Sequence, residues 1–298
     1  IIHEALEQFD ACQEVWEDNQ LRYEEDVKFA RLGEQWPTDD AKQRSDDGRP
    51  MLTVNRMPAF IRQVVNDARQ NKPQIKVLPQ DSDADPQTAE VYNGIIRNIE
   101  ATSKADLAYD TAIDCSATGG IGYFRIGIEY ADEDTFAMDV CIDRVANPLT
   151  VYPAANSTAA ASTDWTHCFV TEMVPEDEFE ATYPNAEKID WKATTLDENE
   201  ASWFSKNEIR VAEYWKREEE EYNIHLLDTD EIVTDEMWDE LKDDYEALGI
   251  GIVKTRKSTR KKVTQYIMTA HEVLETNEWP GQYIPIIPVY GEEVVIDG

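Results

Sequence analysis

Apolar residues recur at helical spacing through the first part of the chain. Within the first thirty residues, acidic side chains separate them, and this pattern predicts an amphipathic helix. Its apolar positions are Leu6, Phe9, Trp16, Tyr23 and Val27. A polar stretch from Gly33 to Pro50 then interrupts the pattern. A second amphipathic helix carries Pro58 in its first turn, where the missing N–H costs nothing, and it ends at Asn71-Lys72-Pro73.

The next segment predicts two consecutive helices. Asp85-Pro86 combines an N-cap side chain with a proline at the first helical position, so a helix is expected to begin there. A break near Thr102-Ser103 leads into a second helix that ends at Gly119. The stretch from Asp81 to Asp85 also resembles the opening of a calcium loop. Its sixth and twelfth positions lack the Gly and Glu that such a loop needs, so helix initiation is the expected use.

From Gly119 onward the apolar period becomes alternating, which is typical of strands. Two alternating runs, 124–130 and 136–142, flank an acidic turn and predict a hairpin. Further strands are expected at 149–152, 167–173, 209–215 and on both sides of Lys257-Ser258-Thr259. Short helices are expected after Pro175 and at 235–248. Near the end, two prolines within Ile284–Gly291 exclude a central strand.

These elements predict an α+β fold, with N-terminal helices followed by a mostly antiparallel β-rich region. We expect a mainly helical part at residues 1–118 and a β-rich part with short helices at residues 119–298. With 298 residues, of which 41% are hydrophobic, the chain is long enough to bury a sizeable core.

The net charge is the property of the composition that most restricts the possible partners of this protein. The chain has 62 acidic and 28 basic residues, a net charge of −34, yet it is too rich in aromatic residues for a disordered acidic tail. Duplex DNA is a polyanion, so a surface this acidic excludes general nucleic-acid binding. Two interpretations remain open. Such a surface could surround DNA without adhering to it, or it could serve only to keep the protein soluble.

No pattern of catalytic residues emerges. The glycines of Gly119-Gly120-Ile121-Gly122 follow a helix and precede a strand, which predicts a helix C-cap and tight turn rather than a phosphate-binding loop. The histidines and cysteines do not have zinc spacing, and no nucleophile motif is present. We therefore expect no catalytic residue, cofactor or metal site, and no disulfide framework. The longest apolar runs are too short to span a membrane.

One basic cluster stands out against the acidity, and it spans the hairpin turn expected around Lys257-Ser258-Thr259. Its members are Lys254, Arg256, Lys257, Arg260, Lys261 and Lys262. Three interpretations remain open for this cluster. It could be a solvated hairpin tip, a surface that docks onto an acidic neighbouring subunit, or a contact to DNA.

Several stretches, in the same order along most of the chain, resemble the portal proteins of short-tailed, double-stranded DNA bacteriophages. They are 33–37, 48–56, 71–79, 89–97, 119–130, 147–152, 211–215 and 280–291. Two departures are local. Pro153-Ala154-Ala155-Asn156 stands where the family commonly has an acidic Asp-Pro loop, and Asp228–Leu248 is an elaborated inset. The chain resembles the wing-like region and stops before the family's stem and clip, so a fragment or the ordered part of a longer protein is expected.

The resemblance implies a structural subunit without catalysis of its own. It implies a homododecameric ring of identical subunits at one capsid vertex, a head–tail connector through which the genome is packaged and ejected. The implied partners are the major capsid protein, the terminase, tail adaptor proteins and DNA that passes without specific binding, with no membrane. The protein would belong to the virion and assemble in the host cytoplasm. Two alternative functions remain open: another head–tail adaptor of the virion, and a carboxylate-rich metal-dependent hydrolase.

Overall fold

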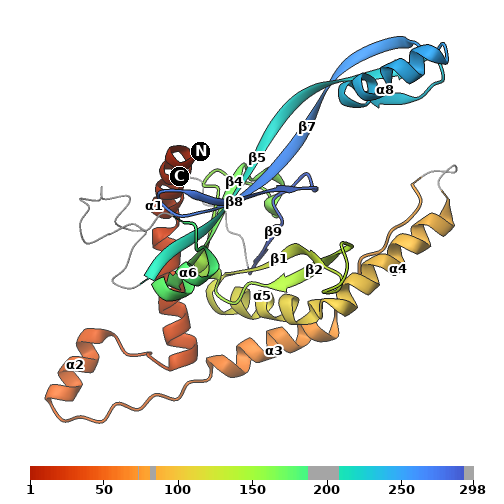
Figure 1. Cartoon of the computed structure of the whole chain (residues 1–298). Helices are drawn as coiled ribbons and strands as arrows, with labels where there is room; N and C mark the ends of the chain where they lie inside the picture. Colours follow the sequence, from red (N-terminus) through yellow and green to blue (C-terminus); the bar gives the residue numbers. More distant parts are fainter. Residues whose placement is uncertain (73, 81–84, 187–207, 292–298) are drawn as a thin grey trace. The chain divides into compact units, whose positions relative to one another are not determined.

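The structure is a computed structural model that describes residues 1–72, 74–80, 85–186 and 208–291. Its fold is α+β, as predicted, with helices first and antiparallel sheets later (Figure 1). The chain forms two compact units. Unit 1 comprises residues 1–7 and 165–284, and unit 2 comprises residues 8–164 and 285–298. The boundary expected at 118/119 falls inside unit 2, at the end of a helix.

The predicted N-terminal helices are present. They are α1 (Ile2–Val27), continued by the π-helical turn η1 (Lys28–Leu32), and α3 (Met57–Gln70), α4 (Pro86–Thr102) and α5 (Ala105–Gly119). One further helix, α2 (Thr38–Asp46), lies in the stretch that we expected to be irregular. None of its residues is buried, so it has no apolar face and leaves no apolar period in the sequence.

The helix ends follow the predicted capping chemistry. The Asp85 carboxylate accepts hydrogen bonds from the backbone N–H groups of Gln87 (2.9 Å) and Thr88 (3.3 Å) and caps α4. Hydrogen bonding to Gln87 also holds the pKa of this carboxyl below its ordinary value. The remainder of the calcium-loop stretch, residues 81–84, lies outside the described residues. Gly120 caps α5 with a φ of 89°, as expected for a glycine C-cap.

A small antiparallel sheet forms the strand part of unit 2. Its order is β2 (Met138–Arg144), β1 (Ile121–Tyr130) and β9 (Ile286–Tyr290), so β9 is an edge strand and tolerates Pro288. Helix α5 packs against β1 on one side and against α3 on the other (Figure 1). Between α3 and η1, Ala30, Ile61 and Val65 form a buried apolar cluster.

Helix α1 is also tied to the segment that follows the hairpin. This segment contains the 3-10 turn η2 (Pro148–Thr150) and strand β3 (Val151–Pro153), and a second 3-10 turn, η3 (Ser162–Asp164), comes later. The ring of Phe9 packs edge-on against Tyr152 at 5.0 Å between centroids, and Trp16 Nε1 donates to the Pro153 carbonyl at 3.1 Å. The apolar face predicted for the first helix therefore faces the core of unit 2.

Unit 1 contains a long antiparallel sheet. Its strand order is β4 (His167–Pro175), β5 (Glu208–Leu227), β7 (Ile252–Met268) and β8 (Val273–Trp279), and β6 (Ile232–Thr234) pairs with β5. Two helices accompany it, α6 (Glu176–Thr182) and α8 (Asp235–Ala247), both near their predicted positions. Phe169 of β4, Tyr214 of β5 and Tyr266 of β7 stack across the three strands, at 4.7 Å and 5.8 Å between centroids.

One prediction about the β region is wrong. We expected a hairpin turn at Lys257-Ser258-Thr259, but these residues lie within the single continuous strand β7. The run from Lys254 to Lys262 is polar on both faces, because it lies at the surface, and so it lacks the alternation that identifies a strand. Strand β5 likewise extends past its predicted end into the acidic run Glu218–Glu221, which pairs with this part of β7.

Candidate functional site

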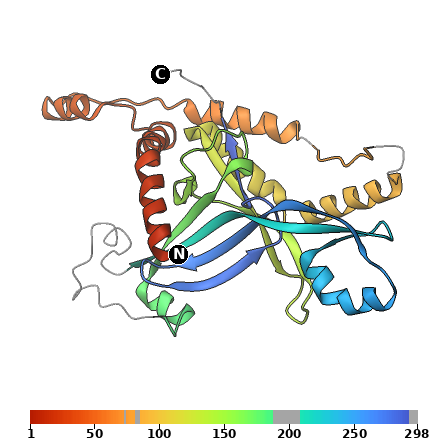
Figure 2. The same ribbon diagram turned by 90° about the horizontal axis from the view of Figure 1, so that it is seen from above.

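The predicted basic cluster lies on a two-stranded extension of the sheet in unit 1, which we call the arm. The arm consists of residues 217–227 of β5 and 252–262 of β7, together with β6 and α8 (Figures 1 and 2). Strand β8 pairs with β7 only at residues 263–268. In the described part of the chain, the edge of β7 at residues 252–262 that faces away from β5 therefore has no strand partner.

Strand register brings the acidic run of β5 opposite the basic run of β7. Lys262 is paired with Glu218, Lys261 with Glu219 and Arg260 with Glu220. Opposite charges at facing positions stabilise a strand pair, and like charges there would destabilise it. Much of the basic cluster thus compensates acidic residues of the same chain.

Arg260 makes the largest set of contacts in the cluster. Its guanidinium lies 2.9 Å from a carboxylate oxygen of Glu220 on β5 and 2.9 Å from one of Glu236 on α8. It also lies over the ring of Tyr222, 5.5 Å from the centroid. The hydrogen bond from Arg260 holds the pKa of Glu220 below its ordinary value. Arg260 therefore links the arm strands to α8.

Two more members of the cluster form ion pairs within the chain, and a third packs on an aromatic ring. Lys257 pairs with Glu221 at 3.2 Å, and Lys262 pairs with Glu278 of β8 at 2.5 Å. The Lys262 pair raises the pKa of that ammonium. Lys261 Nζ lies 5.0 Å from the centroid of the Tyr283 ring. These contacts account for the side chains nearest the base of the arm.

Lys254 and Arg256 differ from the rest of the cluster. Both are exposed, and neither forms an ion pair with any residue that the structure describes. Alternate residues of a strand share a face, so both project from the same side of β7 as Arg260. The structure thus separates the cluster into residues paired within the chain and a pair of cations at the far end of the arm.

A hydrogen-bonded row at the start of α8 fixes this helix to the arm strands. His225 of β5 contacts Thr255 Oγ1 through Nδ1 at 2.8 Å and Asp235 Oδ1 through Nε2 at 2.7 Å. The Asp235 carboxylate also accepts the backbone N–H of Asn223, which is the main reason that its pKa is lowered. No local sequence pattern predicts these hydrogen bonds, because the residues are 10 and 30 positions apart and meet only through strand pairing.

Residues facing away from the strands make α8 strongly acidic. Trp238 and Tyr245, whose rings stack at 5.7 Å, mark the side of the helix turned towards the arm strands, and the Trp238 ring is near His225. Four acidic residues lie on the other sides of the helix, and all of them are exposed. They are Asp239, Glu240, Asp243 and Asp244, whereas Glu236 contacts Arg260 of β7.

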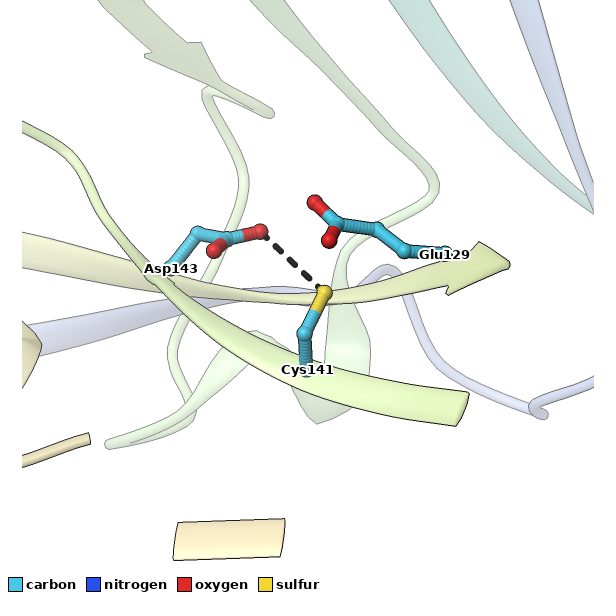
Figure 3. Close-up of side chains that lie close together, drawn as sticks. All are labelled: Glu129, Cys141 and Asp143. Carbon is cyan, nitrogen blue, oxygen red and sulfur yellow. Dashed lines mark hydrogen bonds between the residues drawn. The ribbon is translucent and has the colours of Figure 1, made fainter. Parts of the chain in front are cut away.

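A second cluster, on the β1–β2 hairpin, gathers possible metal ligands that sequence analysis did not predict. Glu129, Cys141 and Asp143 place their donor atoms within 4.8 Å of one another (Figure 3). The Cys141 thiol donates to Asp143 at 3.4 Å, and burial followed by this hydrogen bond raises its pKa to about 11. Arg125 lies 3.9 Å from Asp143, and Gly127, opposite Cys141, leaves room for the sulfur. A protonated thiol beside a compensated carboxylate is a hydrogen-bonded pair, not a prepared metal centre.

The sequence also made predictions about the cysteines and about membrane-spanning helices. All four cysteines are free thiols, two of them buried. No helix in the described part of the chain combines the length and apolar character needed to cross a membrane.

Comparison with known proteins gives one consistent result. The model of a family described as Phage P22-like portal protein matches residues 6–298. A curated relative named "Portal protein", from Acyrthosiphon pisum secondary endosymbiont phage 1, is 24% identical over an alignment of 317 residues. The alignment covers 99% of this chain. The same alignment covers 43% of the relative, so the chain spans less than half of that protein's length.

Proposed function

Because this chain belongs to the P22-like portal protein family, we propose that it acts as part of a structural subunit of a phage portal. The observation that carries the proposal is the family match, which extends over residues 6–298 and so includes both compact units. We assign the chain to the outer, wing-like region of the subunit, outside the stem and the clip. Identical subunits would form a closed ring, twelve-fold in symmetry, at one vertex of the capsid.

The charge of the chain supports a passive relation to DNA. A net charge of −34 repels a duplex, and half of the basic cluster already forms ion pairs with acidic residues of the same chain. We propose that DNA passes through the ring without specific binding during packaging and ejection. The acidic surface would keep the conduit from adhering to its cargo.

We propose further that this ring connects the head to the tail. Its partners would be the major capsid protein, a terminase that supplies the packaging energy, and tail adaptor proteins. The subunits would assemble in the host cytoplasm and remain in the virion at the portal vertex. The family's role is structural, and we propose that the chain has no catalytic activity. No specific observation favours a separate head–tail adaptor or a metal-dependent hydrolase.

Electron microscopy tests the proposed function directly. The complete natural protein that contains this chain is purified and imaged in negative stain, and we expect closed rings with a central hole. Particles that remain monomers or small irregular oligomers at all protein concentrations would contradict the proposal. Stoichiometric Mg²⁺ or Mn²⁺ binding measured by calorimetry would instead favour the hydrolase.

A further inference from the structure

Two cations at the far end of the arm have neither the carboxylate partners of Lys257, Arg260 and Lys262 nor the aromatic contact of Lys261. Lys254 and Arg256 are exposed and form no ion pair among the described residues, whereas Lys257, Arg260 and Lys262 each contact a carboxylate of unit 1. On a chain of net charge −34, most surfaces are acidic. A second copy of this chain therefore offers these two cations many possible counter-charges.

Counter-charges at a suitable spacing lie on α8, within the same arm. Asp239 and Asp243 are one helical turn apart on its exposed side, so their Cα atoms are separated by about 6 Å along the helix axis. Lys254 and Arg256 are two residues apart on a strand, which separates them by about 6.6 Å. The spacing of the two cations thus fits the spacing of the two carboxylates, and each surface is rigid secondary structure.

One exposed apolar side chain accompanies the two cations. Ile252 shares the face of β7 with Lys254 and Arg256 and is 38% exposed, whereas Met237 and Leu241 of α8 project from a different side of the helix than Asp239 and Asp243. Burial of such a side chain supplies the non-directional part of an association, while the charges set its register and its partner. A contact made by Lys254 and Arg256 would therefore be more than two surface ion pairs.

We propose that, in the ring, the end of β7 in one subunit docks on the acidic side of α8 in the next subunit. Lys254 and Arg256 then pair with Asp239 and Asp243 of the neighbouring copy. This contact is heterologous, because each subunit contributes β7 on one side and α8 on the other, and heterologous contacts generate closed rings where the rotation between subunits closes. The inference rests on the proposed portal function and names one of the contacts that would hold its ring together.

The same residues fit a protein partner better than they fit DNA. Three of the six cations form no ion pair among the described residues, and one of these, Lys261, already lies over the ring of Tyr283. A duplex would also meet the acidic residues of α8 on the same arm. Proteins that bind duplex DNA gain affinity from each phosphate that they neutralise. Two cations on a chain of net charge −34 would therefore add little affinity for DNA. Lys and Arg along the unpaired edge of β7 also discourage random strand addition.

The test is charge reversal followed by charge rescue in the complete natural protein. The double variant Lys254→Glu/Arg256→Glu is expected to lose most of its rings, measured by native mass spectrometry and negative stain. A control for the milder variant Lys254→Gln/Arg256→Gln is Lys257→Gln/Lys261→Gln, which removes the same charge on the opposite face of β7 without placing like charges opposite Glu219, and it should keep its rings. Adding Asp239→Lys/Asp243→Lys to the first double variant restores opposite charges and should restore the rings.

Each outcome decides the question. If the unmutated protein forms no rings, the proposed function fails, whatever the variants do. If it forms rings and Lys254→Glu/Arg256→Glu forms them equally well, the docking contact is wrong and the function stands. Rings that are lost in this variant but not restored by the α8 reversal would also overturn the contact.

Circular dichroism verifies that each variant is folded, and the milder Lys254→Gln/Arg256→Gln replaces any variant that is not. It should form fewer rings than the unmutated protein, and an unchanged ring population would overturn the contact.

Discussion

Gly122 lies where strand β1 passes over helix α5, and its role follows from the atoms around it. A Cβ built at this position would overlap the backbone carbonyl of Ala112, whereas the Cβ of Gly119 would meet the ring of Tyr23. Among the three glycines of this motif, only Gly120 has a positive φ. The glycine motif therefore serves a C-cap at one position and close packing at two others, and none of these roles involves a phosphate.

Replacing Gly122 with alanine should destabilise unit 2. The obstructing atoms are backbone, which cannot rotate aside, so the cost should be about 1–3 kcal/mol of unfolding free energy. Urea denaturation of the chain, followed by tryptophan fluorescence, measures it. Gly94→Ala, in exposed α4 with nothing within 4 Å, is the matched control and should stabilise by about 0.5–1 kcal/mol. Equal midpoints for Gly122→Ala and the parent would refute the packing argument.

At the scale of elements, the arm shows how a polar strand is held without a core. Its two strands carry opposite charges at facing positions, and α8 is fixed by the His225 row and by Arg260. Exposed ion pairs are individually weak, so several of them and the strand hydrogen bonds act together. We expect the arm to be less protected than the stacked aromatic centre of the same sheet.

Removing the cation that links the strands to α8 should loosen that helix. Arg260→Gln breaks the contacts to Glu220 and Glu236, and we expect a modest, few-fold loss of amide protection in Asp235–Ala247. Hydrogen–deuterium exchange measured by mass spectrometry resolves the segment. Lys254→Gln removes the same charge without an ion pair, so its protection pattern should match the parent. Unchanged protection in Arg260→Gln would show that the His225 row alone holds α8.

At the scale of the whole molecule, charge dominates. A net charge of −34 makes copies of this chain repel one another and repel DNA, most strongly at low salt. The proposed docking contact contributes only two cations per subunit, and these act against repulsion between entire chains. Ring formation would therefore depend on further contacts in the complete protein.

The chain of residues 1–298 alone should accordingly be largely monomeric at low salt and should not bind duplex DNA. Native mass spectrometry measures the first property, and fluorescence anisotropy with a labelled duplex measures the second. Like-charge repulsion is the reason in both cases. A stable ring formed by this chain alone would contradict the first expectation. DNA binding whose affinity falls steeply with salt would contradict the second and return the basic cluster to a conduit contact.

Local patterns were enough to predict most elements, because capping and periodicity act within a few residues. Asp85-Pro86, the Gly120 cap and the 124–142 hairpin all follow from side chains adjacent in sequence. The prediction fails where an element buries nothing. Helix α2 has no buried residue, and the distal part of β7 is exposed, so neither leaves an apolar period.

The amino-acid sequence by itself determined the charge, the α+β class, the helix caps and the order of family-like segments, all of which are local or additive properties. Only the tertiary structure decided how the basic cluster is used. Strand register places Glu220 opposite Arg260, and Glu236 in the first turn of α8 also contacts Arg260. Lys254 and Arg256 lie further along β7, beyond both of these carboxylates. Pairing between residues that are 24 and 40 positions apart depends on where the chain folds back, which no local pattern encodes.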